Sequence, residues 1–277
     1  MTSTTPSALT AFGLTVRYSD RDILHGVDVR VEPGTVTAMV GPNGCGKSTL
    51  LKTLSRHLRP NSGRVLIGDD DLAALPSRAL AKLVGVLPQA PIVPERITVG
   101  ELVSRGRDPH RRWYQPWSDP DQVAVDLAVA QTGLEDLVDR PVDELSGGQR
   151  QRAWIALLLA QQTDILLLDE PTSFLDIAHQ LDVLELLRSL AHDHGRTVVV
   201  VLHELTLAAR YADTVIAMRD GRIIDSGAPT DTFTPATLEA VFDVTARVIV
   251  DDVTGRPVII PHGRRPEPVE GKDSPDD

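Results

Sequence analysis

The amino-acid sequence predicts an α/β fold whose core is a mixed, largely parallel sheet. Three apolar runs of strand length lead directly into glycine-rich or polar segments: Thr35–Val40, Ile165–Leu168 and Thr197–Leu202. Parallel strands that are buried on both faces have this continuous apolar character, and functional loops follow their carboxyl ends. Apolar residues in Ile177–Ala191 recur at three- and four-residue spacing, which predicts an amphipathic helix stopped by Gly195. We therefore expect a core of β-loop-α units.

Two smaller subdomains are predicted beside this core. Near the N-terminus, Phe12–Tyr18 and Val27–Val31 alternate or run apolar without a helical period, and Val65–Ile67 follows a turn. This pattern predicts an N-terminal antiparallel β subdomain. Between about residues 89 and 160, prolines interrupt the first part, and helical patterns such as Val123–Thr132 and Arg150–Ala160 fill the rest. We expect a helical insertion subdomain there.

The chain is long enough for one sizeable core, and we assign residues 9–245 to a single domain. Late in that domain, Thr214–Met218 and Arg222–Ile224 flank Asp220-Gly221, a dipeptide typical of two-residue hairpin turns. Residues 246–263 are expected to form a C-terminal β extension. Residues 264–277 are rich in proline and charge with almost no apolar content, which predicts a disordered tail.

Composition excludes several classes of protein. The net charge is −11, from 28 basic and 39 acidic residues, so nucleic acid is not an expected partner. Cys45 is the single cysteine, which excludes an internal disulfide and any multi-cysteine metal site. The longest uncharged apolar run, Ala153–Ala160, is far shorter than the roughly 20 residues of a membrane-spanning helix. With no signal-like N-terminus, the expected location is the cytoplasm.

One glycine-rich segment carries the strongest chemical signal. Gly41–Ser48 reads Gly-Pro-Asn-Gly-Cys-Gly-Lys-Ser, and it lies between an apolar strand and a plausible helix, Ser48–Leu58. Such a phosphate-binding loop presents backbone N–H groups at a helix N-terminus to a nucleotide. The Lys47 ammonium would neutralise the β- and γ-phosphates, and the Ser48 hydroxyl would bind Mg²⁺. The predicted ATP-binding residues of this segment are Gly41, Pro42, Asn43, Gly44, Cys45, Gly46, Lys47, Ser48 and Thr49.

A pair of adjacent carboxylates ends the strand Ile165–Leu168. Asp169 suits the Mg²⁺-side acid, acting through water, and Glu170 suits the general base that polarises an attacking water. Successive side chains on a strand point to opposite sides, so the two carboxylates can take different roles. By itself such a pair is usually a solvated strand end. The phosphate-binding loop favours the catalytic interpretation and a P-loop NTPase core.

Leu145–Gln149, with the sequence Leu-Ser-Gly-Gly-Gln, precedes a helical pattern and resembles the signature of ABC transporter ATPases. Ser146 caps a helix start, and the backbone of Gly147 and Gly148 with Gln149 would form a second anion site for a nucleotide presented from outside. The resemblance covers about residues 12–263 and is closest to ATPases of the ferric-siderophore and vitamin-B12 import family. It is carried by Gly41–Leu51, Gly106–His110, Leu145–Ala160 and Leu168–Gln180.

The resemblance implies roles for four further residues. Tyr18 resembles the aromatic residue that stacks on adenine, although an isolated tyrosine there is more often a packed strand residue. Gln89 resembles the glutamine that links Mg²⁺ and the attacking water to the helical insertion. His203 resembles the switch histidine at the γ-phosphate, and Asp176 belongs to a loop that reaches across a dimer. Glu204 follows His203 where the family usually has aspartate.

The resemblance also implies partners. Two copies would sandwich two ATP molecules in a head-to-tail dimer and would drive separate transmembrane permease subunits. An extracytoplasmic substrate-binding protein would deliver the cargo to those permease subunits. The chain would then lie at the cytoplasmic face of the membrane, with the basic segment Arg105–Arg112 in the permease contact region. Ferric siderophores are the expected cargo. Import of haem, cobalamin or another metal complex, an exporter role and a non-transport ABC role are the alternatives.

Overall fold

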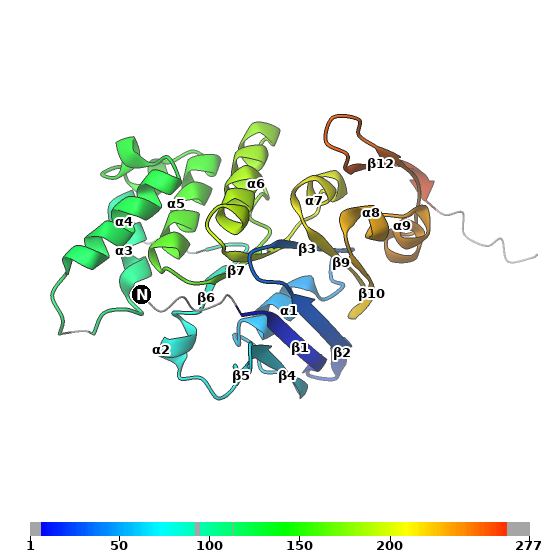
Figure 1. Ribbon diagram of the computed structural model, residues 1–277, viewed down its shortest axis with the longest axis horizontal. Coiled ribbons are helices and arrows are strands. Elements are labelled where there is room, and N and C mark those ends of the chain that lie inside the picture. Colours follow the sequence, from blue (N-terminus) through cyan, green and yellow to red (C-terminus); the bar gives the residue numbers. More distant parts are fainter. Residues whose placement is uncertain (1–6, 92–94, 113, 265–277) are drawn as a thin grey trace, which may run out of the picture.

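The computed structural model describes residues 7–91, 95–112 and 114–264 (Figure 1). A six-stranded mixed sheet has the order β10-β9-β3-β8-β7-β6, and only the β9–β10 pair is antiparallel. Its strands are β3 (Val36–Val40), β6 (Val84–Leu87), β7 (Ile165–Asp169), β8 (Thr197–Val201), β9 (Thr214–Arg219) and β10 (Arg222–Gly227). The predicted α/β core with a mixed sheet is confirmed.

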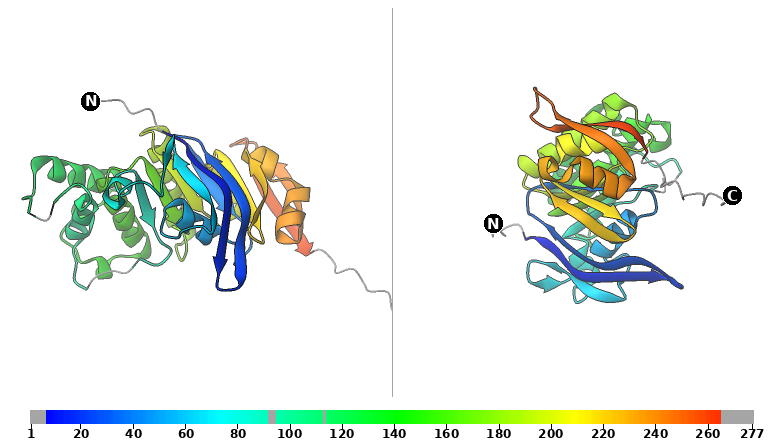
Figure 2. Two further views of the ribbon diagram at one scale, coloured as in Figure 1. Left: turned by 90° about the horizontal axis from the view of Figure 1, so that it is seen from below. Right: turned by 90° about the vertical axis from the view of Figure 1, so that its right-hand side faces the viewer.

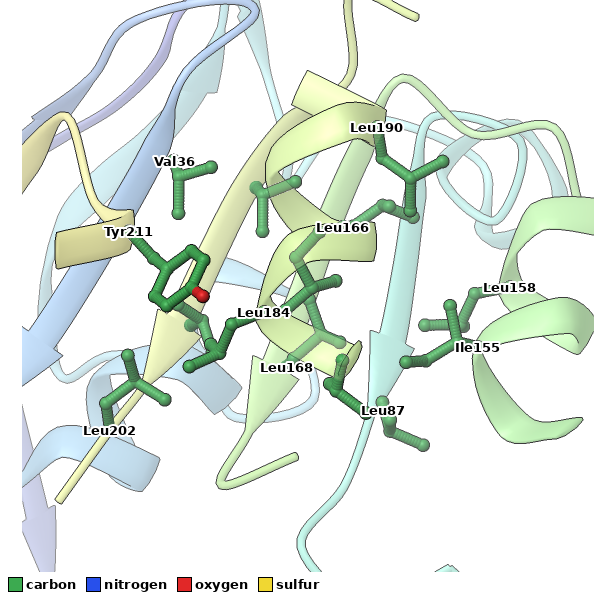
Figure 3. Packing of buried hydrophobic residues seen from close by; sticks show 14 of the residues in the cluster. Val36, Leu87, Ile155, Leu158, Leu166, Leu168, Leu184, Leu190, Leu202 and Tyr211 are labelled. Atoms are coloured by element: carbon green, nitrogen blue, oxygen red, sulfur yellow. The ribbon is translucent and has the colours of Figure 1, made fainter. Parts of the chain in front are cut away.

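Both faces of this sheet are buried, which explains the continuous apolar runs. On one face, Leu166 and Leu168 pack in a cluster with residues of α5 (Gly147–Ala160), α6 (Ile177–His192) and α7 (Leu205–Tyr211); Leu184 of α6 lies beside them (Figure 3). On the other face, Leu167 packs with residues of α1 (Lys47–Leu54) and of the N-terminal strands. Alternate residues of one strand therefore serve two different cores.

The N-terminal antiparallel β subdomain is also present. Its four strands have the order β2-β1-β4-β5 and comprise β1 (Leu9–Tyr18), β2 (Arg21–Val31), β4 (Ser62–Ile67) and β5 (Asp70–Asp71). The first two strands are longer than predicted. Gly63 lies so close to β1 that an added Cβ would be 2.4 Å from the carbonyl oxygen of Phe12. Because that contact is with backbone, only glycine fits at this position.

The predicted insertion contains α3 (Val99–Ser104), α4 (Asp119–Gln131), α5 and the 3₁₀ segments η1 (Arg105–Arg107), η2 (Glu135–Leu137) and η3 (Val142–Glu144). A short helix, α2 (Ser77–Leu80), precedes it. Figure 2 shows these helices at the opposite end of the molecule from the C-terminal hairpin. In the core, α1 ends at Leu54 rather than at the predicted Leu58, since Arg56 adopts a left-handed φ of 58°.

The C-terminal region consists of α8 (Pro229–Thr232), α9 (Pro235–Phe242) and a hairpin of β11 (Val244–Val250) and β12 (Pro257–Arg264). The β9–β10 turn has φ of 47° at Asp220 and 71° at Gly221, the left-handed pair that such a dipeptide favours. β12 ends at Arg264, the first residue of the predicted tail, and residues 265–277 lie outside the described part. Within the described residues, no helix is both long enough and apolar enough to traverse a bilayer.

Candidate functional site

The loop between β3 and α1 has the geometry expected of a phosphate-binding loop. Gly44 and Gly46 have φ of 76° and 108°, which side chains rarely adopt. An added Cβ at Gly41 would lie 2.2 Å from the carbonyl oxygen of Met218 in β9. The loop is held from outside as well, because the Gly221 amide donates to the carbonyl oxygen of Cys45 at 2.9 Å. Backbone conformation therefore favours glycine at Gly44 and Gly46, and close packing against β9 requires it at Gly41.

Lys47 and Ser48 begin α1 inside this loop. The Lys47 side chain is buried, and its Nζ donates to the carbonyl oxygens of Gly41 at 2.8 Å and Pro42 at 2.9 Å. The ammonium is thus held within the loop. The Ser48 hydroxyl donates to Oδ1 of Asp169 at 3.0 Å, which joins the loop to the end of β7. Burial raises the pKa of the neighbouring Cys45 thiol, in keeping with a small filler.

Glu170 is the point where several segments converge. Its backbone has a left-handed φ of 53°, and its side chain is largely buried. Oε2 accepts hydrogen bonds from Gln89 Nε2 at 2.6 Å and Ser173 Oγ at 3.0 Å, and His203 Nε2 lies 2.5 Å from Oε1. Gln89, Glu170 and His203 follow β6, β7 and β8, which are neighbours in the sheet. Strand order therefore brings these three side chains together.

The pKa values of the two adjacent carboxyl groups, Asp169 and Glu170, are shifted in opposite directions. Burial raises the pKa of Asp169, and this outweighs the opposing effect of the hydrogen bond from Ser48. Burial would also raise the pKa of Glu170, but hydrogen bonds from His203, Ser173 and Gln89, with the charge of His203, hold that pKa below its usual range. Glu170 is consequently kept ionised at neutral pH, which is the form a proton acceptor needs.

These groups surround a pocket of about 400 Å³. It is lined by Ile23, Asn43, Gly44, Gly46, Lys47, Ser48, Thr49, Gln89, Glu170 and His203. The structure thus brings most of the predicted loop to one pocket with Gln89, Glu170 and His203. Sequence reasoning missed Ile23, which no local pattern marks. It placed Ser173 only in the loop that reaches across a dimer and missed its contact with Glu170, three residues away.

Other predicted residues lie elsewhere in the chain. Tyr18 is half-exposed, pairs with Arg21 at the end of the β1–β2 hairpin and does not line the pocket. Asp176 caps α6, where its Oδ1 accepts from the backbone N and from Nδ1 of His179 at 3.0 and 2.7 Å. These backbone and side-chain hydrogen bonds hold the pKa of Asp176 below its usual range. Neither residue lines the pocket at the phosphate-binding loop within one copy.

The Leu-Ser-Gly-Gly-Gln segment opens α5 with a capping box. Ser146 Oγ accepts from the Gln149 amide at 3.3 Å, and Gln149 Oε1 accepts from the Ser146 amide at 3.1 Å. First-turn amides such as those of Gly147 and Gly148 have no partner within a helix and can bind an anion. A Cβ on Gly148 would lie 2.3 Å from Cδ2 of His179. This glycine therefore also permits close packing of α5 against α6.

The family model of ABC transporters matches residues 24–173, more than half of the chain. The chain belongs to the ABC transporter family. The achromobactin transport ATP-binding protein of Dickeya dadantii is 46% identical over 258 residues, covering 93% of this chain and 96% of the relative. The ferric enterobactin transport ATP-binding protein of Escherichia coli is 46% identical, covering 91% and 93%. As an ABC ATPase, the chain binds and hydrolyses ATP in a transport system.

A solved structure described as a metal-chelate-type ABC transporter in an inward-facing conformation matches this ABC ATPase with a TM-score of 0.81 and 28% identity. The match covers 93% of this chain and 98% of the other. The protein cbiO1 of Clostridium perfringens, part of the ABC transporter complex cbiONQ, matches with a TM-score of 0.75 and 30% identity, covering 86% and 96%. The likeness to ABC ATPases therefore extends over nearly the whole fold.

Proposed function

We propose that this ABC ATPase powers an importer of ferric siderophores. Two relatives that match over more than nine-tenths of this chain are named for achromobactin and ferric enterobactin transport. A cobalamin import ATP-binding protein of Halobacterium salinarum is 42% identical over 90% of this chain and supports the alternative cargo. The ATPase subunit binds nucleotide rather than cargo. Its own site therefore supports the proposed ATPase mechanism, and the relatives support the proposed cargo.

The observation that carries the catalytic proposal is the convergence of Gln89, Ser173 and His203 on Glu170 beside the phosphate-binding loop. In this proposal Lys47 and the loop amides bind the β- and γ-phosphates, and Tyr18 stacks on adenine. Glu170, ionised and held by three partners, accepts a proton from the attacking water. His203 orients the carboxylate and contacts the γ-phosphate.

The donor set near the loop fits Mg²⁺. The Ser48 hydroxyl and the Asp169 carboxylate lie 3.0 Å apart, and oxygen ligands of this kind, together with phosphate oxygens, are those that Mg²⁺ prefers. Ser48, Asp169 and Gln89 would hold the ion. When bound, Mg²⁺ neutralises charge on the transferring phosphoryl group. The raised pKa of Asp169 is expected to fall once a cation sits beside it.

The nucleotide site is proposed to be composite. Within one chain Ser146–Gln149 does not line the phosphate-loop pocket, whereas its helix start suits an anion. A second copy, arranged head to tail, would bring its Ser146–Gln149 and its Asp176 loop to the ATP bound by the first. Closing on ATP would drive transmembrane permease subunits, which keep the ATPase at the cytoplasmic face of the membrane and receive cargo from an extracytoplasmic binding protein.

Glu170→Gln tests the proposed role of Glu170 as the proton acceptor in ATP hydrolysis. The variant should bind ATP with near-normal affinity and accumulate a closed dimer, because only the proton acceptor is lost. Loss of a general base typically lowers turnover by about 10²- to 10⁴-fold. ATPase activity is measured in the complete transporter, with phosphate release as the readout. Turnover near that of the parent protein would remove Glu170 from this role.

The cargo is tested in a strain that lacks the gene. Uptake of radioactive iron from purified ferric siderophores should be lost, and the parent gene should restore it while the gene carrying Glu170→Gln should not. Cobalamin-dependent growth and haem use serve as parallel measurements. A defect restricted to cobalamin or haem would replace the siderophore proposal with that alternative.

A further inference from the structure

The segment from Arg105 to His110 packs against the C-terminal end of α5, the helix that the signature begins. It enters this contact through Gly106, where an added Cβ would lie 2.3 Å from the carbonyl oxygen of Leu157 and 3.0 Å from Cβ of Ala160. The segment and the last turn of α5 are therefore in direct backbone contact. The signature lies at the opposite end of the same helix, at Ser146.

Arg107 makes the central contacts between the segment Arg105–His110 and the C-terminal end of α5. Its side chain is only 6% exposed, and its Nη1 donates to the carbonyl oxygen of Ala160 at 2.7 Å and to Oε1 of Gln162 at 2.8 Å. The last carbonyl oxygens of a helix have no intrahelical donor, and a positive charge is favourable at that end. Nε2 of His110 donates to the next carbonyl oxygen, that of Gln161, at 2.8 Å.

The other side of Arg107 is tied to the start of α4. Its Nε donates to Oδ1 of Asp121 at 3.0 Å, and the Asp121 side chain is only 7% exposed. The same carboxylate closes the capping box of α4 by accepting from the backbone amide of Ser118 at 3.3 Å, and it also accepts from the Ser118 hydroxyl at 2.6 Å. Burial would raise the pKa of Asp121, but the hydrogen bonds from Ser118 and Arg107 hold that pKa below its usual range.

A buried pair of this kind is better suited to fixing geometry than to adding stability. Desolvation of the two charges offsets most of their attraction, so apolar replacements of similar size are often no less stable. The contacts of Arg107, by contrast, restrict position closely, because one planar guanidinium must meet Asp121, Ala160 and Gln162 together. The segment also contacts α2, since Arg78 Nε donates to the carbonyl oxygen of Pro109 at 2.8 Å.

We infer that Arg107 is a positioning residue that anchors the C-terminal end of α5 and thereby sets where the signature Ser146–Gln149 lies. A helix of 14 residues is a rod of about 21 Å, so a displacement at one end is transmitted to the other. The inference rests on the proposed composite site, in which the signature must meet a nucleotide on a second copy. It gives Gly106–His110 a role in the ATP-dependent closure of that site.

The test compares Arg107→Gln with Arg105→Gln, both in the full chain carrying Glu170→Gln. Arg105 is exposed and lies two residues away in the same 3₁₀ segment, which makes it a matched control. Dimer formation is followed by size-exclusion chromatography over a range of ATP concentrations. For Arg107→Gln we expect the ATP concentration at half-maximal dimer to rise roughly ten- to a hundredfold, as for catalytic groups displaced by about 1 Å. Arg105→Gln should match the parent.

Two further measurements separate positioning from general damage. Affinity of the monomer for a fluorescent ATP analogue should stay within twofold of the parent, because Lys47 and its loop are not disturbed. Backbone amides of residues 147–160 should exchange hydrogen roughly tenfold faster in Arg107→Gln than in the parent, and Arg105→Gln should not change their exchange. Arg107→Lys, which keeps the charge opposite Asp121 but not the planar fork, should show the same changes in smaller measure and serves if Arg107→Gln does not fold.

Unchanged dimerisation and unchanged exchange in both Arg107 variants would overturn the inference. A parallel loss of monomer affinity for ATP would overturn it too, because the defect would then be global. If Glu170→Gln alone formed no ATP-dependent dimer, the composite site itself would be wrong. In that case the amide exchange of α5 still decides whether Arg107 anchors this helix.

Discussion

Glu170 combines a backbone cost with an electrostatic advantage. A left-handed φ at a residue other than glycine costs about 1 kcal/mol or more and persists where the surrounding structure enforces it. Here it is enforced by a turn in which the Ser173 amide donates to the Glu170 carbonyl oxygen at 3.2 Å. The turn presents the carboxylate to Gln89 and His203. Asp169, the preceding residue, faces Ser48 instead.

Lys47 is the residue whose loss should affect nucleotide binding most directly. Lys47→Ala removes a buried ammonium beside the loop carbonyl oxygens, and a hydrogen bond to a charged group contributes about 1.5–3 kcal/mol. We therefore expect affinity for a fluorescent ATP analogue to fall by at least roughly tenfold in a titration. Lys82→Ala, at an exposed lysine outside the pocket, is the control. Equal affinities would contradict the assignment of the phosphate-binding loop.

At the scale of elements, the site is made by the ends of strands and the starts of helices. β3 leads into the phosphate-binding loop, while the carboxyl ends of β6, β7 and β8 deliver Gln89, Glu170 and His203. Parallel strands place these ends at one edge of the sheet. α5 and α6 begin with Ser146 and Asp176 as caps, and neither cap lines the phosphate-loop pocket. Within one chain the two caps are therefore not part of that pocket.

Gly148 tests the packing of α5 against α6. An alanine there would place its Cβ 2.3 Å from Cδ2 and 2.7 Å from Cγ of His179, and overpacking of this kind typically costs about 1–3 kcal/mol. Gly148→Ala should accordingly lower the midpoint of thermal unfolding. Gly147→Ala, whose Cβ would meet only Cδ2 of Leu175 at 3.3 Å, should be tolerated, and His179→Ala should restore the Gly148 variant. Equal midpoints for the two glycine variants would speak against close packing at Gly148.

At the scale of the molecule, the central sheet separates two cores and supports peripheral units at both ends (Figures 1 and 2). The C-terminal hairpin belongs to the larger of these cores. Ala246 is buried in it, Val248 and Ile259 pack on it, and Arg256 Nη1 donates to the carbonyl oxygen of Ala212 at 3.3 Å. The hairpin is thus part of the folded domain rather than an appendage.

Truncation should show that the C-terminal hairpin contributes to the stability of the domain. Removal of residues 244–277 exposes apolar surface under the hairpin, and burial of each apolar side chain contributes about 1.5–3 kcal/mol. For a domain of this size we expect the midpoint of thermal unfolding to fall by roughly 10 °C. Removal of residues 265–277 alone is expected to leave the midpoint unchanged, because that segment has almost no apolar content. Calorimetry of the three proteins decides between these outcomes.

Local patterns in the sequence identified most of the strands, the helices α1, α4, α5 and α6 and the motifs, but not β6 or α7. Continuous apolar runs identified β3, β7 and β8, and the Asp220-Gly221 pair identified the β9–β10 hairpin. Helix ends were less predictable: α1 stops at Leu54 because of the backbone conformation at Arg56. The chemical character of Gly41–Ser48 and Glu170 was also evident, because residue type and spacing are local properties of the chain.

Tertiary structure alone decided which of these residues meet. Gln89 and His203 contact Glu170 because β6, β7 and β8 are adjacent in the sheet although far apart in sequence, whereas the contact of Ser173 with Glu170 is local. The partnership of Arg107 with Asp121 and with the end of α5 likewise depends on how three segments pack. Periodicity and spacing report local conformation, whereas strand order and side-chain partners arise from long-range packing. The sequence by itself therefore determined an ABC ATPase, and the fold determined how its chemical groups are held.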